Sequence, residues 1–393
     1  MRTAPFTAPF TALALAALAA SPAVTQAQTA QPPIKVGLML PATGTFAALG
    51  DMIEKGFRLH VQELGGKLGG REIQYFRVDD ESDPSKATDN VNKLIKRDNV
   101  DVIVGTVHSG VALAMARAVR ESNTLLVIPN AGAVDITGPM CAPNIVRSSF
   151  SNWQPGYAMG IVAGQKGIKR AMTITWNYAA GAETVKGFTE GLEKGGGKVI
   201  KDLNLPFPGV EFQALLTEIA SQKPDAVYAF FAGGAAVKFV KDYDAAGLKK
   251  TIPLFGPGFL TDGTIEAQGA SAQGVLTTLH YADNLDTPRN NAFRKAFALT
   301  YKANADVYAV QGYDAAQILA AGLAAVKGDL AKRDALTAAM RKVTVDSPRG
   351  KFTLSAAGNP VQDIYLREVK GKDNEFRAVA VKALADPSRG CKL

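Results

Sequence analysis

Small and polar residues follow the ends of several apolar runs in this chain of 393 residues. In an open parallel sheet, ligands bind beyond the carboxyl ends of the strands. Glycine at such an end permits a tight turn and lets the backbone approach a ligand closely. The pattern occurs in both halves of the chain, at residues 43–45, 105–110, 130–132, 177–181, 232–234 and 256–258. It predicts a cleft closed from two sides, although any one segment could be a plain turn.

Four common short signatures of catalytic and phosphate-binding sites are absent from the sequence. It has no G-x-S-x-G elbow, no G-x-x-x-x-G-K-[ST] phosphate loop, no H-E-x-x-H motif and no G-x-G-x-x-G after the first apolar run. Ser109 lies beside His108, but neighbours in sequence do not form a nucleophile–base pair, and no orienting acid is identifiable. We therefore do not expect an enzyme, although turnover of a bound compound stays an alternative.

Metal ligands are also sparse. Three isolated histidines (His60, His108 and His280) and two distant cysteines (Cys141 and Cys391) show no ligand spacing, so neither a metal nor a cofactor is expected. In an oxidising compartment Cys141 and Cys391 can form one long-range disulfide, and two separate buried thiols are the alternative.

The composition is that of a folded protein, with 47% hydrophobic and 20% charged residues and a mean hydropathy of +0.02. At this length two lobes or domains are expected rather than a single core. The formal net charge is +8, but lysine and arginine are spread along the chain. Nucleic-acid binding is therefore not expected.

Residues 1–27 have the features of a secretory signal peptide. Arg2 supplies the positive charge, residues 13–20 form a short apolar run, and Thr25-Gln26-Ala27 places small residues before a cleavage site. The run is too short to cross a bilayer, and no cysteine that could carry a lipid anchor follows the site. We expect a periplasmic protein that is soluble after cleavage. An alanine-rich N-terminal helix is the alternative.

Strand-like runs alternate with helical patterns from residue 34 onward. Strands are predicted over residues 34–40, 72–78, 100–104, 125–128, 171–175, 198–200, 226–230 and 252–255, and helices over 47–64, over 84–97 and from Ser109. Strands separated by helices indicate parallel βαβ units. The pattern predicts a two-lobed α/β protein.

Three segments are predicted to cross between the lobes and to form a hinge. The first is a loop over residues 139–151, the second lies near 280–284, and the third lies near 348–358, next to predicted strands over 351–354 and 361–368. The first lobe is expected to comprise residues 28–148 and 282–350. The second is expected to comprise residues 149–281 and 351–393, including the C-terminal tail.

Several of these segments resemble a known family. The stretches IKVGLMLPATGTFAALGDMIEKGFRLHVQELGG, VDDESDPSKATDNVNKLI, DVIVGTVHSGVALAMARAV and LLVIPNAGA are similar to the leucine/isoleucine/valine-binding proteins. The similarity continues through YAFFAGGAAVKFVKDY, PLFGPGFLTDG and VQGYDAAQILAAGL, and so covers nearly the whole predicted mature chain. The resemblance implies a type I periplasmic solute-binding protein of an ABC importer, with two Rossmann-like lobes of parallel sheet joined by a three-segment hinge.

The resemblance also implies where a ligand carboxylate binds. In that family it is held by hydroxyl and backbone N–H groups of two loops, which correspond here to His108-Ser109-Gly110 and Asn130-Ala131-Gly132. Ser109 is a credible N-cap, and a helix N-terminus offers free N–H donors to an anion. Capping alone is the alternative role for Ser109. The second loop departs from the family pattern, because Gly132 has no hydroxyl.

Position 258 is a second departure. Amino-acid-binding relatives place an acid directly after the Gly-Pro, where it pairs with the ligand ammonium, but this sequence has Gly258 and then Phe259. A buried ammonium without its carboxylate costs several kcal/mol. The departure implies a ligand that has a carboxylate and no α-amino group.

Aromatic residues are the remaining candidates for the cleft. Tyr178, Phe231 and Phe259 are expected to contact the ligand, whereas Phe230 is expected in a lobe core; Trp176, His280 and Tyr281 are further candidates. Aromatic walls suit a flat ring. The combination HSG, NAGA, TWNYAAG and GPGFLTDG resembles the subgroup that binds benzoate and 4-hydroxybenzoate.

We therefore expect a monomeric periplasmic protein that captures a small aromatic carboxylate between two closing lobes and delivers it to an ABC permease of the inner membrane. A binding protein for branched-chain or other amino acids is one alternative. A soluble ligand sensor with the same fold is another.

Overall fold

The computed structural model describes residues 1–8 and 31–393. Residues 1–8 form neither helix nor strand. The predicted signal peptide falls mainly on residues 9–27, which lie outside the described residues, so it stays a prediction. From Pro32 to Leu393 the chain forms one compact unit. No helix in the described part is long and apolar enough to cross a membrane.

A six-stranded sheet forms the centre of the first lobe, in the spatial order β2-β3-β1-β4-β5-β6. The strands are β1 (Ile34–Leu40), β2 (Lys67–Leu68), β3 (Arg71–Asp79), β4 (Val102–Gly105), β5 (Leu125–Ile128) and β6 (Ile145–Arg147). The pairs run parallel except for the short β2 against β3. The apolar run of β1 is buried almost throughout, as expected for a central parallel strand covered on both faces.

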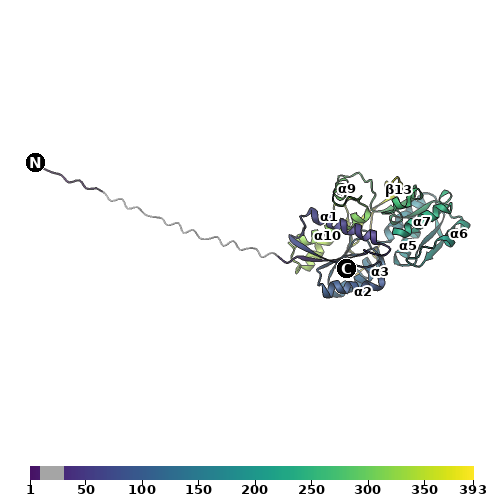
Figure 1. The fold of residues 1–393 in the computed structure, drawn as a ribbon, viewed down its shortest axis with the longest axis horizontal. Helices are drawn as coiled ribbons and strands as arrows, with labels where there is room; N and C mark the ends of the chain where they lie inside the picture. The colour runs from purple at the N-terminus through teal and green to yellow at the C-terminus, as the bar shows by residue number, and fades with distance from the viewer. Residues whose placement is uncertain (9–30) are drawn as a thin grey trace. The chain divides into compact units, whose positions relative to one another are not determined.

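Helices cover both faces of this sheet. α2 (Pro84–Asn92) and α3 (Ser109–Ser122) pack on one face, and α1 (Ala47–Glu63) and α10 (Val307–Ala325) pack on the other. Figure 1 shows α1 and α10 side by side, although they are far apart in the sequence. Gly56 permits this close packing, because a Cβ there would collide with a backbone oxygen of α10.

An eight-stranded sheet forms the centre of the second lobe. Seven strands follow the order β12-β13-β11-β10-β9-β7-β8, and β14 pairs with β13. The strands are β7 (Arg170–Trp176), β8 (Lys198–Leu205), β9 (Ala226–Phe230), β10 (Leu254–Pro257), β11 (Leu276–Leu279), β12 (Thr353–Leu354), β13 (Pro360–Lys370) and β14 (Asp373–Leu384). β7 to β11 run parallel, and the C-terminal strands add an antiparallel edge.

The remaining helices belong to both lobes. The second sheet is covered by α4 (Trp153–Gln165), α5 (Ala179–Lys194), α6 (Gln213–Gln222) and α7 (Gly233–Ala245), with the short α8 (Ile265–Gln268) after β10. The chain then returns to the first lobe, where α9 (Pro288–Tyr301) contacts α1 and α11 (Arg333–Lys342) contacts α10. Figure 1 shows α5, α6 and α7 grouped apart from α1, α2 and α3. The expected two-lobed α/β fold with mainly parallel sheets is confirmed.

The connections between the lobes are tied together by a buried arginine. Arg349, which lies between α11 and β12, donates to the carbonyl oxygens of Ser148 and Ser149. Its Nε lies 3.1 Å from a carboxylate oxygen of Asp314 on α10. Two of the connecting segments are thus hydrogen-bonded to each other. The predicted lobe boundaries themselves stay predictions.

Some predicted elements need correction. The segment 139–151 is not only loop, because it contains β6, the edge strand of the first sheet. The strand predicted over 198–200 continues to Leu205, because Leu203 and Leu205 are buried while their neighbours are exposed, as on an edge strand. The helix predicted over 84–97 ends as α2 at Asn92 and continues as one π-helical turn.

A disulfide joins Cys141 to Cys391, as the cysteine count predicted. The two residues are 250 positions apart, and the bond attaches the C-terminal tail to the loop that precedes β6. Neither cysteine is a free thiol.

Candidate ligand-binding site

A cavity lies between the two lobes, and we refer to it as the central cavity. The space between the atoms inside it and at its mouth, open solvent included, is about 320 Å³. Its polar lining residues are Ser109, Asn130, Asn152, Tyr178 and Tyr308. Its apolar and small lining residues are Phe46, Leu49, Val107, Gly132, Phe150, Ala180, Phe230, Ala232 and Phe259. None of these described lining residues carries a charge.

Five helices start at the central cavity. Its lining includes residues from the N-cap or first turn of α1, α3, α5, α7 and α10, such as Phe46, Ser109, Tyr178, Ala232 and Tyr308. The first turn of a helix has backbone N–H groups without intrahelical partners and carries a partial positive charge. The cavity therefore favours an anion without presenting a cationic side chain.

His108, not Ser109, is the N-cap of α3. Its Nδ1 accepts a hydrogen bond from the backbone N–H of Gly110 at 3.0 Å, so a neutral ring carries its proton on Nε2. Burial lowers the pKa of His108 to about 4, so the ring is neutral near pH 7. Ser109 is the first residue of the helix, and its hydroxyl is therefore not used for capping.

Asn152 supplies the polar group that the second loop lacks. Its backbone N–H donates to the carbonyl oxygen of Gly132 at 2.7 Å, and its Nδ2 donates to Ser109 Oγ at 3.2 Å. A Cβ at position 132 would collide with the Asn152 side chain and with the ring of Phe150. A serine or threonine at position 132 is thus excluded by packing.

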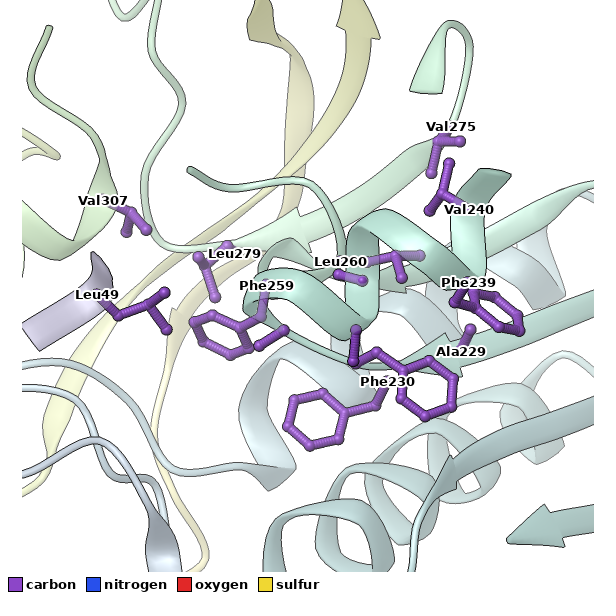
Figure 2. Close-up of a cluster of buried hydrophobic side chains, with 14 of the residues drawn as sticks. Leu49, Ala229, Phe230, Phe239, Val240, Phe259, Leu260, Val275, Leu279 and Val307 are labelled. Carbon is purple, nitrogen blue, oxygen red and sulfur yellow. The ribbon is translucent and has the colours of Figure 1, made fainter. Parts of the chain in front are cut away.

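The walls of the central cavity are aromatic. The ring centroids of Phe150 and Phe259 are 4.8 Å apart, and Phe230 meets Phe259 edge-on at 6.2 Å. Figure 2 shows the ring of Phe259 turned toward Leu49 and Val307, away from Phe239. Leu49 and Val307 belong to first-lobe helices and lie in the same buried hydrophobic cluster as Phe259, so this cluster extends across both lobes.

Two tyrosines, Tyr178 and Tyr308, line the central cavity. The ring of Tyr178 packs against Phe230 at 6.2 Å and against His108 at 4.8 Å. Tyr308 is fully buried, and its hydroxyl has no hydrogen-bond partner among the described residues. A buried hydroxyl without a partner is costly unless a ligand or water completes it.

Gly258 faces a buried ion pair. Arg367 binds Asp262 through two parallel hydrogen bonds, of 3.1 Å and 2.8 Å, and Asn374 Nδ2 donates to the same carboxylate at 2.9 Å. A Cβ at Gly258 would collide with Arg367 and would lie 2.5 Å from Asp262 Oδ2. The carboxylate is therefore engaged by Arg367 and Asn374, and the space beside Gly258 is filled.

Comparison with known proteins identifies the family. The family model for periplasmic binding proteins matches residues 33–374. The chain belongs to this family. A curated relative, the "Leu/Ile/Val-binding protein homolog 6" of Brucella melitensis, is 30% identical over 373 residues, which cover 92% of each chain.

Two solved structures are similar to this periplasmic binding protein. A solute-binding protein of an ABC transporter from R. palustris, in complex with benzoate, is 54% identical with a TM-score of 0.90, covering 92% of this chain and all of that one. Another, from Rhodopseudomonas palustris BisB5 in complex with 3,4-dihydroxybenzoic acid, is 30% identical with a TM-score of 0.85, covering 90% and 99%. The predicted resemblance to this family and to its aromatic-acid binders is confirmed.

The structure places only part of the predicted site of this periplasmic binding protein at the cavity. Ser109, Asn130, Gly132, Tyr178 and Phe259 line the central cavity, whereas His108, Gly110, Ala131 and Gly258 do not. Of the further candidates, Trp176, His280 and Tyr281 are buried outside its lining. No group of three or more potential metal ligands occurs in the described ranges.

The positions expected for Phe230 and Phe231 are exchanged. Phe231 does not line the central cavity; it packs in the lobe core against Trp176, Phe212 and Phe239. Phe230, which was expected in the core, lines the cavity instead. Successive side chains of a strand point to opposite sides, so only one of the two can reach the cavity.

The sequence interpretation missed Asn152, Phe150 and Tyr308. Phe150 lies in the segment that was interpreted as a connecting loop, Asn152 comes directly after that segment, and no motif distinguishes either residue. Tyr308 lies in the first turn of α10, where its position at a helix start could have drawn attention to it.

Proposed function

We propose that this protein is the extracytoplasmic solute-binding component of an ABC importer and that it captures an aromatic monocarboxylate of the benzoate or 4-hydroxybenzoate type. The observation that carries the proposal is the lining of the central cavity, where helix N-termini and hydroxyl groups meet aromatic walls and no described side chain is charged. The protein binds and releases its ligand unchanged, acts as a monomer in the periplasm and has an inner-membrane permease as its partner.

The carboxylate binds at the start of α3. Ser109 Oγ and the free N–H groups of the first helical turn are the donors there. Hydrogen bonds to a charged group are worth about 1.5–3 kcal/mol each. The His108 cap contributes a neutral ring, so the helix terminus rather than a cation supplies the attraction.

The ring lies between the aromatic walls. Phe150, Phe230 and Phe259 present flat apolar surfaces, and aromatic pairs add about 0.5–1.5 kcal/mol each beyond simple burial. The unpartnered hydroxyl of Tyr308 is available to a ring hydroxyl or to water. The solved relative in complex with benzoate, at 54% identity, supports this ligand class.

An α-amino acid is the competing ligand, since the curated relative is named for leucine, isoleucine and valine. Its ammonium would need a carboxylate, yet Asp262 is already held by Arg367 and Asn374. An unpaired buried ammonium costs several kcal/mol, or more than about a hundredfold in affinity. This argument favours a ligand without an amino group.

Replacing Ser109 tests the proposal. In Ser109→Ala the dissociation constant for benzoate should rise by about tenfold or more, because one hydrogen bond to a charged group is lost. The matched control is Ser85→Ala, an exposed serine in the first turn of α2. Isothermal titration calorimetry of both variants with benzoate gives the answer. An unchanged dissociation constant in Ser109→Ala would refute the site.

A further inference from the structure

Ser109 is linked to the half-buried carboxyl group of Glu183 by one amide side chain. Asn152 Nδ2 donates to Ser109 Oγ at 3.2 Å and to Glu183 Oε2 at 2.7 Å. An amide nitrogen carries two hydrogens, so both bonds coexist. Glu183 does not line the central cavity. Any effect that it has on hydrogen bonding to a ligand therefore passes through Asn152.

The chemistry of Glu183 sets the orientation of the Asn152 amide. Glu183 Oε2 also accepts a hydrogen bond from the backbone N–H of Val134, at 3.1 Å. This oxygen faces two donors, so it carries no proton, whether the carboxyl group is ionised or neutral. Asn152 must turn its N–H groups, and not its carbonyl oxygen, toward it. The amide oxygen is then left beside Gly132, where it fills the space of a missing side chain.

The fixed amide determines what Ser109 can offer to a ligand. A hydroxyl has one hydrogen to donate and two lone pairs that accept. Because an N–H of Asn152 already points at Ser109 Oγ, the oxygen accepts from that side and its hydrogen is free for another acceptor. Ser109 lines the central cavity, so a carboxylate oxygen fits there. An amide NH₂ or an ammonium group cannot accept this hydrogen; it could bond only to the second lone pair of Oγ and would leave the hydroxyl hydrogen without an acceptor.

We propose that Glu183 is a positioning residue that, through Asn152, makes Ser109 a hydrogen-bond donor and so selects carboxylates over neutral amides. The inference rests on the proposed function and adds the origin of its selectivity. The link also joins the two lobes, because Glu183 lies on α5 beside the second sheet and Val134 follows β5 of the first. Opening of the cleft would separate these two residues.

The same link makes ligand binding depend on pH. Burial raises the pKa of Glu183 to about 7, from 4.5; Asn152, the Val134 N–H and Arg147 lower it, and Asp135 raises it. The other charged groups on its outer side are Lys186, Asp386 and Arg389. In an open cleft the group regains water and an ordinary pKa. The closed form thus binds the proton more tightly, so affinity falls as the pH rises from about 4.5 to about 7.

Three variants separate positioning from simple packing. Glu183→Gln keeps an acceptor oxygen for Asn152 and Val134 but cannot ionise, and Glu183→Ala removes the acceptor. Glu193→Gln is the matched control, an exposed glutamate on the same helix. The probes are benzoate and benzamide, titrated calorimetrically into each variant at pH 5.5 and pH 8.

Glu183→Ala should lower the preference for benzoate over benzamide by about tenfold or more, because Asn152 is free to turn. Glu183→Gln should keep that preference and lose most of the fall in benzoate affinity between the two pH values, which Glu193→Gln should retain. An unchanged preference in Glu183→Ala, or an unchanged pH dependence in Glu183→Gln, overturns the inference.

The outcomes also distinguish this inference from the proposed function. If the wild type and Glu193→Gln bind no benzoate at either pH, the proposed function fails. If the wild type and Glu193→Gln bind benzoate, and the Glu183 variants show the same ligand preference and pH dependence as these two proteins, only the positioning role of Glu183 fails. Should Glu183→Ala not fold, the pH dependence of Glu183→Gln decides alone.

Discussion

The absence of a side chain at position 258 is explained by packing as well as by the missing charge. A side chain at this position would run into Arg367 and Asp262, whose ion pair is buried almost completely. Asn374 and Thr277 complete the hydrogen bonds of this pair. Under the proposed function, adding an acid at position 258 alone would therefore not convert the site for amino acids, because Arg367 and Asp262 fill the space.

Gly258→Ala should lower the free energy of unfolding by about 3 kcal/mol or more, because the added Cβ forces the buried ion pair apart. Gly234→Ala is the matched control, since a Cβ there meets no atom within 4 Å. Urea denaturation of both variants measures the effect. Equal stability of Gly258→Ala and the wild type would show that the pair tolerates the extra atom, contrary to this account.

At the residue scale, the sequence predicts the polar side of the site better than its aromatic side. Ser109 follows a strand end and starts a helix, which is a local signal. The choice between Phe230 and Phe231 depends on which face of β9 meets the first lobe, and a strand buried on both faces carries no alternation that would decide it. Asn152 is placed by tertiary contacts alone.

The helices that start at the central cavity are the elements that matter most. α1, α3, α5 and α7 each follow a strand, and the sequence predicted the starts of α1 and α3 at residues 47 and 109. α10 follows α9, and its start was not predicted. β14 and β6 were not predicted: β14 is an exposed edge strand with a weak apolar pattern, and β6 has only three residues. Short edge strands depend on the neighbouring strand for their existence rather than on their own sequence.

The start of α10 contains a half-buried carboxylate, Asp306, whose replacement should stabilise the protein at neutral pH. Asp306 Oδ1 accepts from the N–H of Ala309 and caps the helix. Burial raises the pKa of Asp306 to about 7, from 3.8, and Asp262 and Asp283 add to the rise. The folded state therefore holds the proton more tightly, and stability falls as the pH rises from about 4 to about 7.

Asp306→Asn keeps a capping oxygen and removes the group whose ionisation lowers the stability as the pH rises. Relative to the wild type, the variant should gain about 1 kcal/mol or more in the free energy of unfolding between pH 4 and pH 7.5. Chemical denaturation at both pH values measures the gain. A difference between variant and wild type that does not change with pH would contradict the raised pKa.

At the scale of the whole molecule, the alternation of strands and helices predicts the two lobes. The helices α9 and α11 pack against α1 and α10, while the predicted crossovers and lobe boundaries stay predictions. The order of the strands in each sheet could not be read from the sequence. It depends on which strand each helix packs beside, and that is decided by contacts between residues far apart in the chain.

The disulfide ties the C-terminal tail to the first lobe. The double variant Cys141→Ser with Cys391→Ser should lose about 5 kcal/mol of stability, less any strain relieved, because a loop of 250 residues is no longer closed in the unfolded chain. Its affinity for benzoate should stay unchanged, since neither cysteine lines the central cavity. Guanidinium denaturation of the variant and of the oxidised wild type tests this. Identical denaturation midpoints would contradict the stabilising role of the bond.

The most direct test of the ligand class is calorimetric titration of the mature protein with benzoate and, under identical conditions, with leucine. Both ligands present a carboxylate to Ser109, and only leucine brings an ammonium that needs a partner. The account predicts saturable binding of benzoate and an affinity for leucine at least about a hundredfold weaker. Tight binding of leucine with none of benzoate would contradict the account. A side-chain carboxylate would then have to pair with the leucine ammonium in the central cavity, whereas Asp262 is already paired with Arg367.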